Sequence, residues 1–170
     1  AGSFLLLAGS YLCGLVLVSF HQGPGAAGRE HAHGGRPLGE ILRTPVVILA
    51  VSAAALGYGV MSFIMTATPI SMHVHSGHSL ESTKLVIQSH IAAMYLPALI
   101  YPWLQARLGF RGMLYLGAIA YFVCLAVAVV NTNFINYWLS LVLLGVGWNF
   151  LFLSGTNLLP TGYRREERFR

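Results

Sequence analysis

The stretch from Gly112 to Val130 reads GMLYLGAIAYFVCLAVAVV and contains no charged residue. An α-helix rises 1.5 Å per residue, so about 20 apolar residues are needed to cross the roughly 30 Å hydrocarbon core of a bilayer. The stretch shows none of the alternation of apolar and polar positions that a transmembrane β-strand requires. It therefore predicts a transmembrane helix over residues 112–130.

Four more apolar blocks flank this helix. The chain of 170 residues is 56% hydrophobic and only 9% charged, whereas a soluble domain carries about 25% charged residues. This leaves too little polar surface to cover a water-soluble globule. The predicted fold class is an all-α membrane protein, a polytopic bundle of transmembrane helices with five spans at residues 1–20, 46–72, 82–105, 112–130 and 136–159.

Both ends of the chain are expected to be cut within a longer protein. Ala1 lies within the first apolar block, and Arg170 ends a charged run. A signal peptide would need a basic start and a small-residue cleavage site, and residues 1–20 offer neither. We therefore expect a cut transmembrane helix at the start and a piece of a longer protein overall.

Basic residues fall in every second loop. The linker at 21–45, rich in Gly and Pro, contains three Arg; the turn at 106–111 contains two, and the tail at 161–170 contains four. The turns at 73–81 and 131–135 contain no Lys or Arg. The positive-inside rule places the basic loops in the cytoplasm, so we expect Ala1 outside and Arg170 in the cytoplasm.

Signatures of an enzyme are missing from the sequence. It has no Gly-x-Ser-x-Gly elbow, no phosphate loop, no paired carboxylates and no CxxC. We therefore predict that the chain is not an enzyme, with no catalytic residues and no cofactor. Its basic regions have no interleaved aromatic residues on a soluble domain, so nucleic-acid binding is not expected either.

Three histidines, His73, His75 and His78, cluster in the predicted outer turn. Clustered imidazoles can bind zinc or copper. Their spacing is irregular, and no Cys or acid completes a tetrahedral set, so we predict a polar turn without a metal. A metal-ion permease or sensor that uses these side chains remains an alternative, and the linker adds His31 and His33.

Polar side chains inside the predicted spans are the candidate pathway residues, because a polar group in hydrocarbon is costly unless it is paired. Gln88 and His90 are two positions apart, about 200° around a helix, so they cannot face one cavity. One is expected to line a pathway and the other to brace a neighbouring helix. His90 is the best candidate to carry a proton if the chain carries one, and a histidine bonded between helices is the alternative.

The last block offers a further candidate. Gly145, Asn149, Phe152 and Thr156 share one helix face, where Asn149 offers an amide to a substrate or to a partner helix. Small-residue stripes of this kind also pack helices in membranes, so a non-transporting membrane assembly protein is a second alternative. The predicted pathway residues are Thr66, Gln88, His90, Trp148 and Asn149.

Several of these motifs together resemble a group of bacterial major facilitator superfamily transporters. The stretch MTATPISM at 65–72, the His-rich turn at 73–80 and the stretch VIQSH at 86–90 resemble the seventh helix, the loop after it and the eighth helix of that group. The stretch GVGWNF at 145–150 resembles its tenth helix. The resemblance implies that the five spans are helices six to ten of a twelve-helix transporter, with 21–45 as the linker between its halves.

The same resemblance implies a cytoplasmic gating loop at 102–111. Leu104, Arg107, Gly109 and Arg111 match the superfamily's Gly-x-Leu-x-Asp-Arg-x-Gly-x-Arg pattern. Ala106 replaces its Asp, which removes the carboxylate of a salt-bridge latch. Pro102 stands where the first Gly is expected.

The function that the resemblance implies is secondary active transport by alternating access. The expected partners are a small-molecule solute, protons as a candidate coupling ion, the lipid bilayer and the missing helices of the parent transporter. The expected location is a bacterial inner membrane. The superfamily does not fix the substrate, because one fold serves many solutes.

Overall fold

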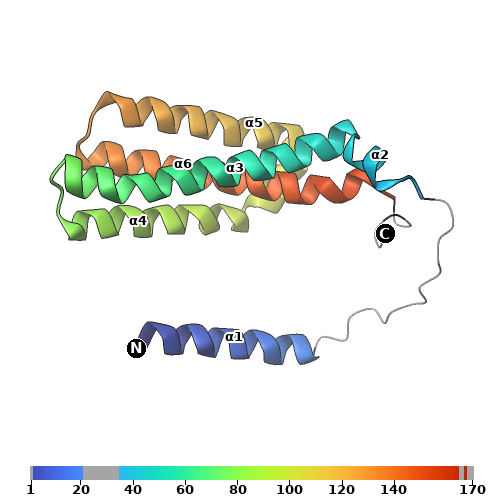
Figure 1. Ribbon diagram of the computed structural model, residues 1–170, viewed down its shortest axis with the longest axis horizontal. Coiled ribbons are helices and arrows are strands. Elements are labelled where there is room, and N and C mark those ends of the chain that lie inside the picture. The colour runs from blue at the N-terminus through green and yellow to red at the C-terminus, as the bar shows by residue number, and fades with distance from the viewer. Residues whose placement is uncertain (1, 21–34, 165–166, 168–170) are drawn as a thin grey trace. The chain divides into compact units, whose positions relative to one another are not determined.

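The structure is a computed structural model that describes residues 2–20, 35–164 and 167 (Figure 1). It divides into two units, residues 1–34 and 35–170. The first contains helix α1, Gly2–Phe20, which is exposed throughout residues 7–20. The hydroxyls of Ser10 and Ser19 donate to carbonyls of the same helix, so α1 satisfies these polar groups by itself.

The second unit is a bundle of helices. It comprises α2 (Leu38–Leu42), α3 (Pro45–Ile70), a π-helical turn (Ser71–His75), α4 (Leu80–Tyr95), a 3₁₀ turn (Leu96–Leu99), α5 (Tyr101–Val130), α6 (Phe134–Leu158) and a second 3₁₀ turn (Leu159–Gly162). Three described helical stretches are long and apolar enough to cross a membrane, namely Pro45–His75, Tyr101–Val130 and Phe134–Gly162. The predicted all-α membrane fold, a partial bundle, is thereby confirmed.

Helix α6 lies at the centre of this unit and packs against α3, α4 and α5 (Figure 1). One end of the bundle carries the turns at 76–79 and 131–133, and we call it the histidine end. The other carries Arg36, α2 and Gly162, and we call it the linker end. Side-chain caps begin two helices at the histidine end: Ser79 Oγ accepts from the Ser82 amide at 3.1 Å, and Asn133 Oδ1 accepts from the Asn136 amide at 2.9 Å.

The helical stretch that begins with α3 runs past its predicted end at Met72. The chain widens into a π-helical turn that ends at His75, and the Ser76 amide donates to the Ser71 carbonyl at 3.0 Å. Pro69 lies just before this turn and has no N–H to donate, so the regular hydrogen-bond ladder is interrupted there. The predicted polar turn at 73–79 therefore begins later, at Ser76.

The path between the predicted spans 82–105 and 112–130 also differs from the expectation. Helix α4 ends at Tyr95, and a new helix begins at Tyr101 after a 3₁₀ turn that contains Pro97. The following helix is interrupted at Gly109, whose φ of 67° is left-handed. Proline removes a donor and glycine permits this φ, so the break falls at the prolines and the reversal at Gly109.

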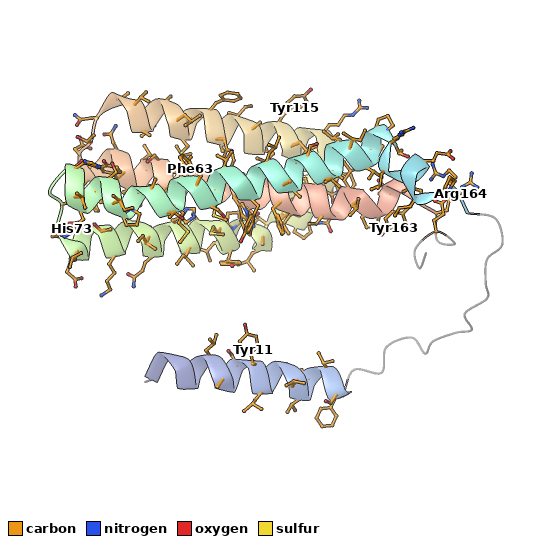
Figure 2. All side chains as sticks on the ribbon, in the orientation of Figure 1. Tyr11, Phe63, His73, Tyr115, Tyr163 and Arg164 are labelled. Atoms are coloured by element: carbon orange, nitrogen blue, oxygen red, sulfur yellow. The ribbon has the colours of Figure 1, made fainter. Side chains whose placement is uncertain are left out.

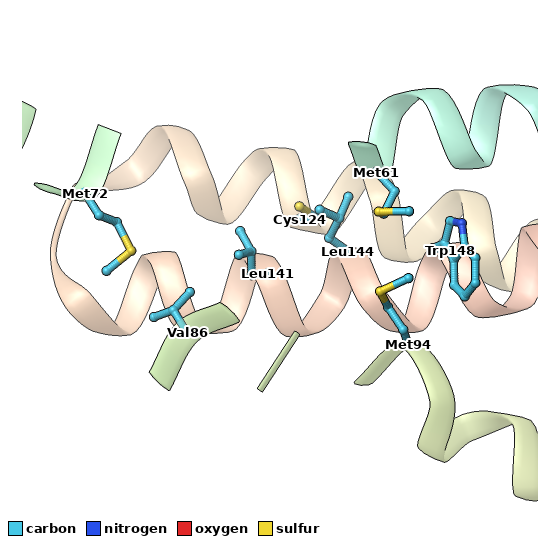
Figure 3. Close-up of a cluster of buried hydrophobic side chains, with 8 residues drawn as sticks. All are labelled: Met61, Met72, Val86, Met94, Cys124, Leu141, Leu144 and Trp148. Carbon is cyan, nitrogen blue, oxygen red and sulfur yellow. The ribbon is translucent and has the colours of Figure 1, made fainter. Parts of the chain in front are cut away.

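A buried apolar core lies around α6 (Figure 3). It consists of Met61, Met72, Val86, Met94, Cys124, Leu141, Leu144 and Trp148. Three glycines of α6 allow the neighbouring helices to approach closely. A Cβ at Gly145, Gly147 or Gly155 would lie 2.8, 3.0 or 2.6 Å from a carbonyl oxygen of α4, α5 or α3, respectively. Each glycine therefore fixes α6 against a different neighbour.

Candidate functional site

Four aromatic rings from three helices form a continuous row across the bundle, which we call the aromatic row: Tyr95 on α4, Trp148 and Phe152 on α6, and Tyr58 on α3. Trp148 and Phe152 lie one helical turn apart and stack, with ring centroids 5.0 Å apart and planes 12° from parallel. Tyr95 meets Trp148 edge-on at 6.3 Å, and Tyr58 lies 6.4 Å from Phe152. Such tilted and offset contacts are favoured between aromatic rings.

The two ends of the aromatic row are open to the surroundings. Tyr58 is 54% exposed and Tyr95 is 63% exposed, whereas Trp148 is only 8% exposed. Tyr58 lies roughly 20 Å along α3 from Pro45. Tyr95 is the last residue of α4 and lies roughly 22 Å along that helix from Leu80, which is at the histidine end. Among the described residues, neither hydroxyl has a hydrogen-bond partner.

A groove begins at one end of the aromatic row. It has a volume of about 510 Å³, within the range of roughly 300–1,000 Å³ that is usual for ligand pockets. Tyr58 and Phe152 border it, and small residues of α3 and α6 line the rest. Its lining residues are Ala50, Val51, Ala54, Ala55, Tyr58, Gly59, Phe152, Gly155, Thr156 and Leu159. The groove is therefore almost wholly apolar, with hydroxyls of Tyr58 and Thr156.

Asn149 is buried and bonded across the contact between α4 and α6. It is 2% exposed, and its Nδ2 donates to the Met94 carbonyl at 2.8 Å. In the 3₁₀ turn that follows α4, residue 97 would donate to this carbonyl, and Pro97 has no N–H. Asn149 therefore supplies the donor that the helix break removes.

His90 and Gln88 lie on different faces of α4, as their spacing predicts. His90 is fully buried, at 0% exposed, and its Nδ1 contacts the Leu141 carbonyl on α6 at 2.7 Å. A carbonyl can only accept, so Nδ1 carries the proton, and Nε2 has no partner among the described residues. Gln88 is exposed and borders a shallow hollow with Lys84 and Phe134.

The remaining predicted pathway residues are not brought together into one site. Thr66 is exposed, and its hydroxyl donates to the Ser62 carbonyl of its own helix at 2.7 Å. Trp148 belongs to the aromatic row, and its Nε1 has no partner within the described part of the chain. Trp148 thus belongs to the aromatic row, whereas His90 and Asn149 lie in the contact between α4 and α6.

The predicted gating-loop residues lie at the linker end. Gly109 makes the reversal there, at φ 67°. Leu104 packs against a small core of Tyr101, Met113 and Phe150. The guanidinium of Arg107 lies over the Trp103 ring, 4.1 Å from its centroid. Arg111 is exposed.

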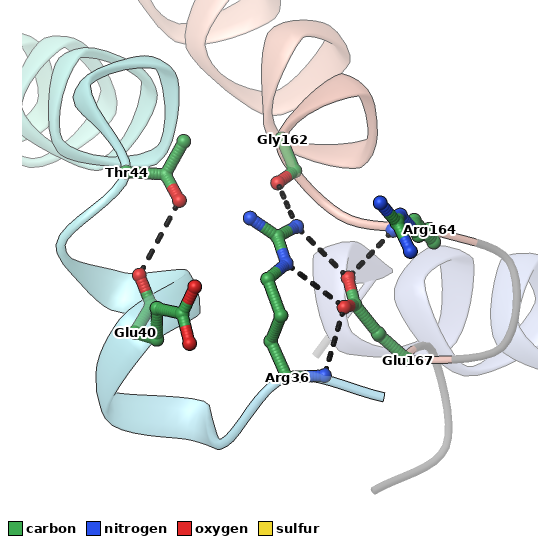
Figure 4. Close-up of polar contacts among 6 residues, drawn as sticks. All are labelled: Arg36, Glu40, Thr44, Gly162, Arg164 and Glu167. Carbon is green, nitrogen blue, oxygen red and sulfur yellow. Dashed lines mark hydrogen bonds and ion pairs between the residues drawn. The ribbon is translucent and has the colours of Figure 1, made fainter. Parts of the chain in front are cut away.

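An ion pair joins the linker to the chain after α6 (Figure 4). Arg36 Nε lies 3.0 Å from Glu167 Oε1, and its NH2 group donates to Glu167 Oε2 at 3.0 Å and to the Gly162 carbonyl at 3.3 Å. The backbone amides of Arg36 and Arg164 also donate to the carboxylate. The Arg36 side chain and the Arg164 amide lower the pKa of Glu167 to about 2. In turn, the bonded carboxylate raises the pKa of Arg36.

Two of the three histidines in the predicted outer turn, His73 and His78, contact backbone carbonyls. His73 Nδ1 contacts the His78 carbonyl at 3.0 Å, and His78 Nε2 contacts the Thr132 carbonyl at 2.8 Å. His78 also meets the ring of Tyr137 edge-on, 5.7 Å away. Within the described ranges, no group of three or more potential metal ligands is found. His31 and His33 lie outside the described residues. His73 lies at the opposite end of the bundle from Tyr163 and Arg164 (Figure 2).

Sequence reasoning missed Tyr58, Tyr95 and the aromatic row as a unit. The i, i+4 spacing of Trp148 and Phe152 could have suggested a pair on one face. No spacing within one helix shows which rings of α3 and α4 meet that pair, because the contacts lie between segments far apart in the chain. The Arg36–Glu167 pair joins residues 131 positions apart and was missed for the same reason.

Comparison with known proteins finds transporters. The chain is 36% identical over 170 residues to the riboflavin transporter RfnT of Brucella anthropi, covering 99% of this chain and 42% of that protein. It is 35% and 32% identical to two uncharacterized MFS-type transporters of Bacillus subtilis, YdeG and YddS, each over 94% of this chain. The chain thus spans about two fifths of the length of these relatives. No family model and no solved structure matches.

Proposed function

This chain belongs to the major facilitator superfamily as a segment of an MFS-type transporter, and on that premise we propose that its parent protein moves a small solute across the membrane by alternating access. The observation that carries the proposal is the similarity to a named transporter along nearly the whole chain, at 36% identity. Because these relatives are transporters, the prediction that the chain is not an enzyme is confirmed.

Riboflavin is the solute that we propose to test first. It is the solute in the name of RfnT, and its three-ring system is flat and aromatic. The aromatic row and its adjoining groove support this choice, because flat aromatic surfaces favour stacking. Trp148 is the predicted pathway residue that belongs to this row.

The other predicted pathway residues take different roles in this proposal. Gln88 is exposed on α4 and is proposed to face the pathway. His90 and Asn149 are proposed to brace α4 against α6, since each makes its hydrogen bond to a carbonyl across that contact. Of the two roles that the sequence left open for His90, this proposal assigns it the role of bracing the neighbouring helix. Protons remain a candidate coupling ion, carried by residues elsewhere in the parent protein.

The orientation is proposed from charge. The described Arg residues of the bundle lie at the linker end, namely Arg36, Arg43, Arg107, Arg111 and Arg164, whereas Lys84 lies near the histidine end. The positive-inside rule then places the linker end in the cytoplasm. Labelling of single cysteines in intact cells tests this. Thr132→Cys should react with a membrane-impermeant maleimide, and Ala106→Cys should react only after lysis.

Uptake by the full-length parent protein tests the transport proposal. The protein is expressed in a bacterial strain that cannot synthesise riboflavin, and uptake of labelled riboflavin is measured with and without a protonophore. We expect growth on micromolar riboflavin and uptake above the empty-vector level. Protein present in the membrane without any uptake would exclude riboflavin transport.

A further inference from the structure

Tyr58 and Tyr95 lie near the middle of the bundle, and their exposed hydroxyls indicate that the aromatic row does not face lipid. Tyr58 and Tyr95 are both more than half exposed and lie roughly 20 Å from a helix end, well inside a hydrocarbon core of about 30 Å. A phenol hydroxyl that faces lipid without a partner is costly. In the parent protein, a surface that presents two such hydroxyls at this depth is therefore better suited to a solute pathway or to contact with a further helix than to lipid.

The rings are arranged to accept another ring. The stacked pair of Trp148 and Phe152 forms the middle of the row, and the exposed faces of Tyr58 and Tyr95 lie at its ends. Beside Tyr58, the groove is bordered by Gly59, where an added Cβ would meet no atom within 4 Å. The structure thus leaves open space at Gly59, beside Tyr58 in the lining of the groove.

We infer that the aromatic row and the groove beside it form the subsite for the planar ring system of a heteroaromatic solute, which stacks on Tyr58 and Phe152 and lies over Gly59. This inference rests on the proposed transport function and names the residues that select its solute. The groove is lined almost entirely by apolar atoms, and the Thr156 hydroxyl donates to the Phe152 carbonyl of its own helix, so stacking and apolar contact would hold the ring. The open glycine sets the room that is available for the ring.

Binding of ring-only and chain-only probes tests the subsite in the purified full-length parent protein. Lumiflavin carries the flavin ring system without the ribityl chain, and ribitol carries the chain alone. Flavin fluorescence reports binding. We expect lumiflavin to bind and to compete with riboflavin, and ribitol not to compete. If ribitol competed and lumiflavin did not bind, the inference would be wrong.

Three variants locate the subsite. Gly59→Phe fills the groove and should abolish measurable lumiflavin binding. Tyr58→Leu removes a stacking ring and should raise the dissociation constant about three- to tenfold. Tyr115→Leu is the matched control, because Tyr115 is 71% exposed on α5 and points away from the bundle (Figure 2); its binding should be unchanged. Thermal unfolding of each variant verifies that it folds. If Gly59→Phe does not fold, Tyr58→Leu alone tests the subsite.

The outcomes separate this inference from the transport proposal. If the wild type takes up riboflavin and the Gly59 and Tyr58 variants take it up and bind lumiflavin equally well, the subsite is wrong and transport stands. If lumiflavin binds as expected and the wild type takes up no riboflavin, the subsite stands and riboflavin transport fails.

Discussion

The side-chain amide of Asn149 on α6 donates to the Met94 carbonyl on α4 at 2.8 Å. This contact lies where Pro97 breaks the hydrogen-bond ladder of the helix after Met94. It therefore links the sequence feature that interrupts one helix to a polar residue buried in the next. The same contact satisfies the Nδ2 donor of the buried amide, whereas Oδ1 of Asn149 has no partner among the described residues.

Asn149→Leu in the parent protein should lower its free energy of unfolding by about 0.5–2 kcal/mol, because the Met94 carbonyl loses its donor. Thermal or denaturant unfolding in detergent measures this. Asn157→Leu is the control, since Asn157 is exposed on the same helix. Equal stability of the two variants would show that the amide does not brace the helices.

Two glycines should respond to alanine in opposite ways. A Cβ at Gly147 would lie 2.6 Å from Tyr121 Cδ1 and 3.0 Å from the Gly117 carbonyl, so Gly147→Ala should destabilise the protein by about 1–3 kcal/mol. A Cβ at Gly59 meets nothing within 4 Å, so Gly59→Ala should be neutral or stabilise by up to about 1 kcal/mol. Unfolding measurements on both variants decide this, and a stable Gly147→Ala would contradict the close approach of α5 and α6.

His90 should matter for stability rather than for the pH dependence of transport. His90→Ala removes the donor to Leu141 and leaves a cavity, so we expect a loss of about 1–3 kcal/mol. His90→Asn keeps a donor and should retain part of this stability. Imidazoles titrate at roughly pH 5.5 to 8. Over this range, the pH profile of solute uptake should be the same in His90→Asn and in wild type. A flattened profile in the variant would assign the proton to His90 instead.

The Arg36–Glu167 pair should stabilise the linker end at neutral pH. The folded-state pKa of Glu167, about 2, lies below its ordinary value of 4.5. Its contribution is therefore complete above about pH 4.5 and is lost as the pH falls toward 2. Glu167→Gln should lower the melting temperature at pH 7, and this deficit should shrink as the pH falls from 4.5 to 3.

Glu81→Gln is the control for this experiment. Glu81 pairs with Lys84 at 3.6 Å, and its side chain is 86% exposed, so its loss should have little effect at any pH. The charge swap Arg36→Glu with Glu167→Arg should restore part of the lost stability. A swap no better than either single change would mean that the two charges do not act as a pair.

Particular elements show how far sequence reasoning could reach. The block 112–130 predicted a membrane helix because length and hydropathy are local properties, and the opposite faces of Gln88 and His90 followed from helix geometry alone. The end at Met72 was placed too early, because polar histidines suggested a turn where backbone hydrogen bonds continue to His75. The apolar block 82–105 was predicted as one span, whereas α4 ends at Tyr95 and the break at Leu96–Leu99 depends on Pro97.

The sequence by itself determined that this chain is a bundle of apolar helices related to transporters, because the need to hide backbone polar groups from hydrocarbon permits little else for such long apolar blocks. Only the tertiary structure decided which side chains meet. It placed Tyr95, Trp148, Phe152 and Tyr58 in one row and joined Arg36 to Glu167. The physical reason is that helix periodicity fixes the face on which a residue lies, while packing against other helices fixes what that face contacts.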